Sequence, residues 1–498
     1  MDEAPLLSKR EGRIIITWEA LVEELKKVNL IAAPFVAVAL SQYLLQVVSM
    51  MMAGHLGELA LSGVAIASSI CNVTGFSLLG GFSAALETLN GQAYGAMKYE
   101  KLGSYTYCAI ISTLPICLPV CILWMYMDRF LVLMGQDPQV AEVACSYSMW
   151  LIPGLFAFAI LQSQIRFFQS QSFMLPLLFT SLATLCFHIP VCWFLVFQTG
   201  LGNIGAALAI SISYWFNVFL LGLYMRYSSS CEKTRLVCLK DVFLCVKEFF
   251  QFAIPSAVMA CLEWWSYEIL VLMSGLLPNS TLETSVLSIC LTSAALHYQI
   301  PFGFSVAAST RISNELGAGN PQAAQLSTFI VVALTLAETF IASTTLFCCR
   351  HVFGYAYSNE LEVVNKVTNM VPLMCLSLIM DGLHGVTSGI VRGIGWQHFG
   401  AYANLAAYYL FGIPAGIICA FVLHLKGEGL WIGMLTGSSV QGILLVFVIA
   451  FTNWKKQAVE ARERIFQGAI PEEAEAERAE CGEIVKPFES RHISADFI

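Results

Sequence analysis

Charged residues are scarce in this sequence. Lys, Arg, Asp and Glu together make up 12% of its 498 residues, while 57% of the residues are hydrophobic. A soluble protein carries about a quarter charged residues, so the composition argues against a water-soluble fold. The few charges gather in segments 1–28 and 226–248 and after Trp454. The long stretches between these clusters are therefore suited to lipid.

Signatures of several function classes are also missing. No basic patch with interleaved aromatic residues occurs, so we do not expect nucleic acid as a partner. No GxxxxGK[ST] phosphate loop is present, so ATP is not the evident energy source. The 17 cysteines lie mostly in apolar stretches, without a CxxC pair or a Cys/His cluster, which fits small packing residues. We expect no enzymatic activity, no metal site and no cofactor, which leaves coupling to an ion as the energy source.

The apolar stretches indicate membrane-spanning helices. Each is about 20 residues or longer, enough to cross a bilayer, and a backbone in lipid must satisfy its own hydrogen bonds. The pattern predicts an all-α integral membrane protein with twelve transmembrane helices. They lie near residues 29–53, 61–88, 104–127, 140–165, 174–197, 204–225, 248–274, 285–310, 324–349, 362–391, 399–423 and 430–452.

Basic residues set the expected orientation. An even number of spans places both termini on one side, and if this side is cytosolic, the outer segments hold only Arg129, Arg350, Lys366 and Lys426. All other Lys and Arg residues then face the cytosol, as the positive-inside rule requires. The polar, acidic start MDEAPLLSKREGR does not resemble a signal peptide. Asn279, in an Asn-Ser-Thr glycosylation sequon, falls on the outer side.

The two halves of the chain resemble each other. Pro34 recurs as Pro255, and at almost the same offset GFSAALETLNGQAYGA (81–96) recurs as GFSVAASTRISNELGA (303–318). Each half holds six spans, so the repeats share one topology and should be related by an axis along the membrane normal. Two such lobes around a midplane site are typical of secondary transporters, and we see no filter-like loop of a channel.

The repeat and the charge clusters define the expected domains. Two pseudo-symmetric six-helix lobes are joined by a basic cytosolic linker, and polar segments flank them. The segments are 1–28 (cytosolic N-terminal segment), 29–225 (N-terminal lobe), 226–247 (cytosolic linker), 248–452 (C-terminal lobe) and 453–498 (cytosolic, largely disordered acidic tail).

Several motifs resemble one family. They are AGHLGELALSG (53–63), ETLNGQAYGA (87–96), CLEWWSYE (261–268), PFGFSVAASTRISNELGAGNP (301–321) and VRGIGWQ (391–397). On these motifs the chain resembles the multidrug and toxic compound extrusion (MATE) family, especially its plant detoxification branch, over most of its length. The resemblance implies a V-shaped pair of six-helix lobes. It also implies export of organic compounds in exchange for protons, or for sodium in some bacterial members.

Two carboxylates lie inside the seventh span. An acid inside the bilayer is costly and marks a functional site by default. Glu268 follows Glu263 by five residues, a rotation of about 140°, so the two cannot share a face of a straight helix. The resemblance places the principal protonation site at Glu263 and makes Glu268 the second carboxylate of the motif. The repeat equivalent of Glu263 is Gln42, so proton coupling should be concentrated in the C-terminal lobe.

The tenth span holds a third candidate for proton coupling. Asp381 lies mid-span, and its position relative to VRG resembles the acidic site of the family in this span. His384 is three residues further and shares a helix face with it. His384 could pass a proton or bond the carboxylate, and the alternative for it, as for His188 and His297, is a packing role.

Two further acids lie in other spans. Glu338, in the ninth span, is also deep, but it matches no family site. Glu87 lies near the cytosolic end of the second span and is expected to reach interfacial water.

Aromatic and amide side chains are the candidate substrate-binding residues. Aromatic faces attract organic cations, although helix packing or an interfacial belt explains each aromatic residue as well. NVTG (72–75) resembles a pocket-lining motif of eukaryotic relatives. The candidates are Gln42, Asn72, Trp264, Tyr267, Tyr298 and His384.

These features predict a secondary active transporter. It would export cationic or polar organic compounds from the cytosol in exchange for protons, by rocking of two lobes, and act as a monomer in the bilayer. One alternative is a lipid-linked precursor flippase of related fold, which would carry more basic residues in its cavity. Another is a non-transporting receptor or scaffold, which would not need duplicated lobes. The segment DEAPLL (2–7) fits an acidic dileucine pattern and favours the vacuolar over the plasma membrane.

Overall fold

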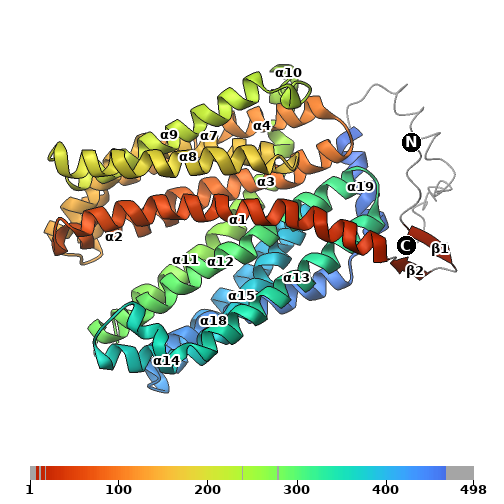
Figure 1. Cartoon of the computed structure of the whole chain (residues 1–498). Coiled ribbons are helices and arrows are strands. Elements are labelled where there is room, and N and C mark those ends of the chain that lie inside the picture. Colours follow the sequence, from red (N-terminus) through yellow and green to blue (C-terminus); the bar gives the residue numbers. More distant parts are fainter. Residues whose placement is uncertain (1–6, 11–12, 17, 238, 278–279, 467–498) are drawn as a thin grey trace, which may run out of the picture.

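The molecule is a V of two helical arms. Figure 1 shows the computed structural model, which describes residues 7–10, 13–16, 18–237, 239–277 and 280–466. The N-terminal half, in red to yellow, forms one arm, and the C-terminal half, in green to blue, forms the other (Figure 1). We call these arms the N lobe (α1 to α9) and the C lobe (α11 to α18).

Most of the described chain is helical. A short antiparallel hairpin of β1 (Leu7–Arg10) and β2 (Arg13–Ile16) precedes the lobes. The N lobe consists of α1 (Trp18–Gly54), α2 (Glu58–Cys71), η1 (Asn72–Phe76), α3 (Ser77–Gly95), α4 (Tyr99–Thr113), α5 (Cys117–Met125), α6 (Met127–Leu133), α7 (Pro138–Ser170), α8 (Met174–Trp193), η2 (Phe194–Gln198) and α9 (Asn203–Tyr227). The linker contains η3 (Ser229–Cys231) and α10 (Leu239–Leu244). The C lobe consists of α11 (Val246–Ser274), α12 (Ser280–Gly317), α13 (Pro321–Cys348), α14 (Arg350–Phe353), η4 (Gly354–Ala356), α15 (Leu361–Ile394), α16 (Gln397–Asn404), η5 (Leu405–Gly412), α17 (Ile413–Ile417), η6 (Ile418–Val422) and α18 (Lys426–Ala450), and α19 (Trp454–Phe466) follows it.

The predicted spans correspond to these helices. Among the described residues, eleven helices are long and apolar enough to cross a membrane. The remaining predicted span, 285–310, lies inside α12, which is 38 residues long. α12 packs against α1, α3, α13 and α15, and its buried hydroxyl groups, such as those of Ser305 and Ser309, lower its hydropathy. The all-α fold with twelve spans in two lobes is therefore confirmed.

The internal repeat produces a local twofold relation between the lobes. A Cβ on Gly95 of α3 would lie 1.9 Å from the backbone oxygen of Asn314, and one on Gly317 of α12 would lie 2.2 Å from that of Gln92. In the sequence, the separation between Gly95 and Gly317 equals the separation between Gln92 and Asn314. Each contact is thus the counterpart of the other, as a twofold axis between two copies requires. The axis passes between α3 and α12, where glycines let the backbones approach.

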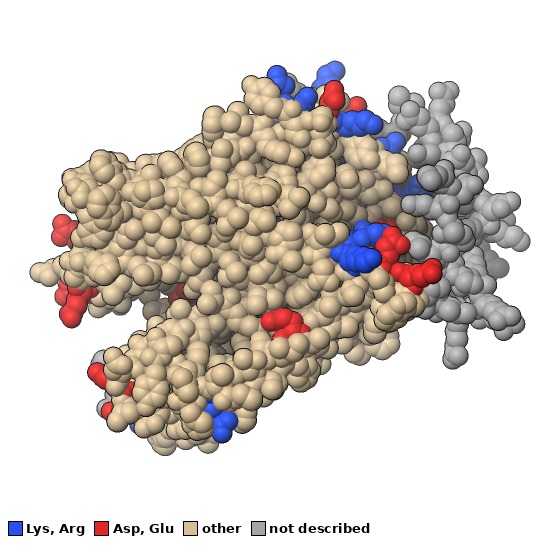
Figure 2. Space-filling model, viewed as in Figure 1, with Lys and Arg blue, Asp and Glu red and all other residues tan. Residues whose placement is uncertain are grey.

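Most Lys and Arg side chains lie at the end of the molecule opposite the cleft (Figure 2). In Figure 2 the cleft between the lobes opens at the end opposite α10 and α19, and the flanks of both lobes are nearly free of charged side chains. Lys and Arg residues gather mainly at the end where α10 and α19 lie (Figure 2). An uncharged belt between two polar ends is the surface that a bilayer requires.

The linker between the lobes and the segment after the last span, both expected to be polar, contain helices. The linker includes α10, and the beginning of the segment predicted to be a largely disordered tail folds as the 13-residue helix α19. α19 buries Gln457, Ala458, Ala461 and Ile465, and it contacts α3 of the N lobe as well as α12 and α13 of the C lobe. Residues 467–498 of the predicted tail, the sequon residue Asn279 and most of the dileucine segment (2–6) lie outside the described residues.

Candidate functional site

Glu263 faces the interior of the C lobe. It lies on α11, and its carboxylate accepts a hydrogen bond from Nδ2 of Asn404 at 3.4 Å. Asn404 is held in place because the same Nδ2 donates to the backbone oxygen of Met259 at 2.8 Å. Gln441 makes a further polar contact, and Arg392 supplies positive charge to the surroundings of Glu263. An intramembrane carboxylate is thus surrounded by polar groups from three other helices.

Asp381 lies on α15 in the same polar region. His384, one turn further along, has its Nε2 3.8 Å from Oδ1 of Asp381, too far for a hydrogen bond. Both ring nitrogens of His384 are buried without a hydrogen-bond partner among the described residues. Its ring stacks on Tyr298, with ring centroids 5.8 Å apart. Glu263 and Asp381 lie close enough to interact electrostatically, so we group the two acids in one cluster.

Tyrosine and amide side chains connect the two acids. The hydroxyl of Tyr267 lies 3.2 Å from the hydroxyl of Ser438. Ser438 in turn is within hydrogen-bonding reach of Asp381. The Tyr408 hydroxyl donates to Oε1 of Gln441 at 2.7 Å, and the Tyr267 and Tyr408 rings lie 5.8 Å apart. We call Glu263, Asp381, Tyr267, Tyr298, His384, Asn404, Tyr408, Ser438 and Gln441 the C-lobe cluster. It could exchange protons and bind a cation with the same carboxylates.

Glu268 and the two tryptophans of the motif have other surroundings. Glu268 accepts a 2.6 Å hydrogen bond from Ser69 on α2, and Trp265 donates to the backbone oxygen of Val73 in η1 at 3.0 Å. Both partners belong to the N lobe, so this face of α11 contacts the opposite lobe. Trp264 is 52% exposed. The structure therefore separates Glu268 and Trp264 from the C-lobe cluster, and their predicted roles stay predictions.

The N-lobe candidates line a different region. Asn72 borders a small cavity of about 10 Å³ together with Gln46, Ser68 and Tyr147. Asn72 begins η1, a π-helical turn, and such turns often occur at functional sites. The amide nitrogen of Gln42 is buried and has no hydrogen-bond partner among the described residues. The N lobe thus offers amides where the C lobe offers acids.

Two acids singled out in the sequence have close partners. Glu338 on α13 lies 3.0 Å from Nε2 of His297 on α12. Glu87 was expected to reach interfacial water, and this expectation is wrong. Its side chain is 1% exposed and pairs with Arg166 of its own lobe at 3.0 Å and with Arg392 of the C lobe at 2.9 Å.

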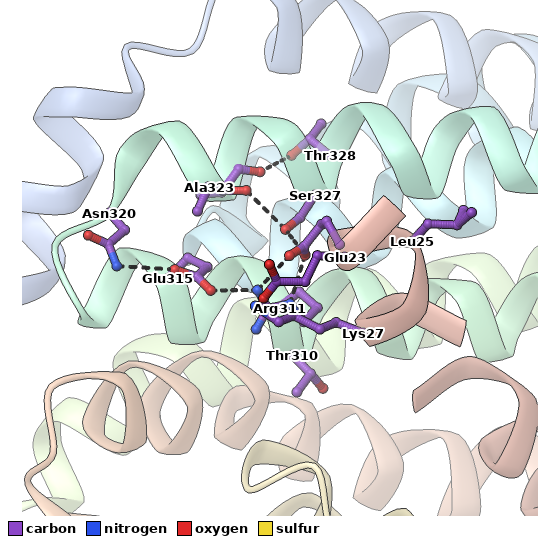
Figure 3. A network of polar contacts seen from close by, with 12 residues as sticks. Glu23, Leu25, Lys27, Thr310, Arg311, Glu315, Asn320, Ala323, Ser327 and Thr328 are labelled. Atoms are coloured by element: carbon purple, nitrogen blue, oxygen red, sulfur yellow. Dashed lines mark hydrogen bonds and ion pairs between the residues drawn. The ribbon is translucent and has the colours of Figure 1, made fainter. Parts of the chain in front are cut away.

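Polar bonds between the lobes close the end opposite the cleft. Arg311 on α12 donates to both carboxylate oxygens of Glu24 on α1, at 2.8 Å each. Ser327 also donates to Glu24 at 2.5 Å, and Glu315 accepts from Arg311. Figure 3 shows Arg311, Glu315 and Ser327 of this network. The Glu87–Arg392 ion pair adds a second interlobe link. Such pairs must break if this end opens.

Several residues of the C-lobe cluster were missed from the sequence. Asn404, Tyr408, Ser438 and Gln441 lie in the last two spans, and none belongs to a motif quoted for the family. The two amides carried a usable signal, because a side-chain amide in an apolar span needs hydrogen-bond partners. The hydroxyl groups carried none, since Ser and Tyr are common in membrane helices and can bond to their own backbone.

Comparisons with known proteins identify the family. The MatE family model matches residues 34–194 and 255–418. The two matches begin at Pro34 and Pro255, the positions at which the repeat was recognised in the sequence. Protein DETOXIFICATION 3 of Arabidopsis thaliana is 55% identical over 451 residues, which cover 90% of this chain and 95% of that protein. Protein DETOXIFICATION 14 of the same plant is 53% identical over 459 residues, 92% and 94% of the two chains.

Solved structures agree with this assignment. The crystal structure of the eukaryotic MATE transporter AtDTX14 superposes with a TM-score of 0.86 at 53% identity and covers 90% of this chain and 100% of its own. A mutant of the Vibrio cholerae MATE transporter VcmN gives a TM-score of 0.78 at 16% identity over 88% of this chain and all of its own, which shows the fold alone. The chain belongs to the MatE family and is a multi-pass secondary transporter.

Proposed function

We propose that this transporter exports cationic or polar organic compounds from the cytosol in exchange for protons. The observation that carries the proposal is the C-lobe cluster, which brings Glu263 and Asp381 together among polar partners inside one lobe. A carboxylate can hold either a proton or a cation. If protons and the cationic substrate compete for the same carboxylates, this competition alone would make export depend on protons.

The cycle follows from the two ends of the molecule. With the cleft open, protons from an acidic compartment bind Glu263 and Asp381 and release the substrate. Rocking of the lobes then breaks the Glu24–Arg311 and Glu87–Arg392 pairs and opens the other end. Substrate entering there meets carboxylates that can return their protons to the cytosol.

The proposed orientation places α19 and the start of α1 in the cytosol. Figure 1 has both at the end where Lys and Arg gather in Figure 2, which supports the positive-inside assignment. The cleft then opens to the far side. We further propose the vacuolar membrane as the location, on the acidic dileucine pattern at 2–7, and a monomer as the working unit, because each chain holds a complete pair of lobes.

Transport into proteoliposomes tests the coupling. The purified chain, reconstituted with an acidic lumen, should accumulate radiolabelled tetraethylammonium as a probe cation. Glu263→Gln and Asp381→Asn should each lower pH-driven uptake by about tenfold or more, because each change removes a carboxylate that would bind both proton and cation. Glu268→Gln should retain more uptake, because Glu268 bonds to Ser69 across the lobes. Full pH-driven uptake by Glu263→Gln would contradict the proposal.

A further inference from the structure

A histidine and a glutamate form a pair in the C lobe outside the C-lobe cluster. Nε2 of His297 on α12 and Oε1 of Glu338 on α13 are 3.0 Å apart. Their side chains are 14% and 21% exposed. The second carboxylate oxygen, Oε2 of Glu338, is buried and accepts no hydrogen bond from the described residues. A glutamate and a histidine in contact at membrane depth are costly unless they share a proton.

The pair lies beside the turn of α15 that carries Asp381. Thr339, which follows Glu338 in the sequence, packs closely on Gly382 of α15. A Cβ on Gly382 would lie 2.4 Å from the Thr339 methyl group. His297 also interacts electrostatically with Asp381. His297 therefore interacts with both acids, and a proton gained by one of the three groups changes the proton affinity of its neighbour.

Other charged groups on the helices around the pair are engaged elsewhere. On α12, Arg311 pairs with Glu24 of α1, and Glu283 pairs with Lys366 of α15. From α3, Glu87 pairs with Arg392 of α15. Charged residues of α18 and α19 occur at the ends of the bundle, such as Glu428 and Lys456. Within α15, the acid that interacts electrostatically with His297 is Asp381.

A second histidine, buried in the N lobe, has different partners from His297. His188 on α8 lies between the hydroxyls of Ser49 and Ser213, at 3.1 and 2.9 Å. These partners satisfy a neutral ring, so a packing role explains His188 fully. His297 instead faces the carboxylate of Glu338. If the imidazole is neutral and the carboxylate is ionised, the negative charge of the pair is not compensated.

We propose that His297 and Glu338 form a second proton-binding site, which loads and unloads together with Asp381. One proton held between Nε2 and Oε1 makes the pair electrically neutral overall. Its release leaves a neutral imidazole and a carboxylate, and the proton goes to solvent or to an ionised Asp381. The proposal rests on the proposed proton exchange and adds a site to it, so more than the two acids of the cluster would contribute to proton binding.

Proton counting tests this site without any substrate. The full-length chain in detergent is stepped from alkaline to acidic pH, and a pH-indicator dye measures the protons it takes up. Glu338→Gln and His297→Gln should each take up about one proton fewer per chain, and the double variant should lose little more than either one, because the pair titrates as a unit. The matched control, His188→Gln, should take up as many protons as the unaltered chain.

The transport assay separates this proposal from the proposed function. Both pair variants should shift the pH dependence of tetraethylammonium uptake, while His188→Gln should not. Glu338→Asp keeps a carboxylate and should restore the proton count, which a purely structural role of Glu338 does not predict. If Glu338→Gln does not fold, His297→Gln provides the same measurement. Unchanged proton counts in the folded pair variants would overturn the second site, whatever uptake Glu263→Gln retains.

Discussion

At the scale of single residues, two adjacent glutamates of α1 have opposite environments. Glu24 is buried and bonds to Arg311 and Ser327, whereas Glu23 pairs with Lys27 at the surface, where the two side chains are 44% and 43% exposed. Removing one partner of a buried pair costs up to about 3–5 kcal/mol, less here because Arg311 keeps Glu315, and an exposed pair contributes about 0–1 kcal/mol. Glu24→Gln should therefore lower the melting temperature of the purified protein clearly, and Glu23→Gln should leave it nearly unchanged. Equal melting temperatures would mean that the Glu24–Arg311 pair does not stabilise this state.

Residue types predicted part of the candidate site. Glu263 and Asp381 stood out because acids are rare in apolar spans, and the structure brings them into one cluster. The expected rotation between Glu263 and Glu268 is also seen, since Glu268 bonds to Ser69 of the other lobe. The burial of Glu87 could not be predicted. Its partners Arg166 and Arg392 come from distant spans, and only the packing of the lobes brings them together.

At the scale of elements, the crossing of α3 and α12 depends on glycine. A Cβ at Gly95 would lie 1.9 Å from a backbone oxygen of Asn314, whereas a Cβ at Gly80 of the same helix would meet nothing within 4 Å. Overpacking a tight contact costs about 1–3 kcal/mol. Gly95→Ala should therefore loosen the interlobe contact and reduce uptake of tetraethylammonium severalfold, with Gly80→Ala as the control. Similar uptake by both variants would show that the lobes need not approach this closely during transport.

Elements were predictable where hydropathy alone decides them. Apolar runs located the spans, but they gave no sign of π-helical turns such as η1 and η5, which depend on local packing. α19 was missed because WKKQAVEARERIF was interpreted only by its charge. Its buried Gln457, Ala458, Ala461 and Ile465 follow a helical period that the sequence already contained. Their burial depends on α12 and α13, which hydropathy does not place beside the tail.

At the scale of the whole molecule, the two lobes meet in two different ways. At the closed end, ion pairs and glycine contacts join α1 and α3 to α12 and α15. Toward the cleft, α11 contacts the N lobe through Trp265 and Glu268. The first set must separate for the closed end to open. The C-lobe cluster, which we propose binds protons, lies within one lobe, so protonation there would change its contacts without disrupting the fold of either lobe.

This division predicts which bonds break when the transporter opens to the other side. Arg392→Gln removes an interlobe ion pair but leaves Glu87 with Arg166 of its own lobe. Hydrogen–deuterium exchange measured by mass spectrometry should then rise at the closed end in both α3 and α12. Exchange within the N lobe, where α7 packs on α9, should stay as it was.

The matched control breaks an ion pair within one lobe. Lys366→Gln removes the partner of Glu283 inside the C lobe, so its exchange should rise only locally, near α12 and α15 at that pair. Rigid lobes that rock require this contrast, because motion between them loosens interlobe contacts and leaves intralobe contacts intact. A rise spread through α7 and α9 in Arg392→Gln would instead indicate that the N lobe deforms as the molecule opens.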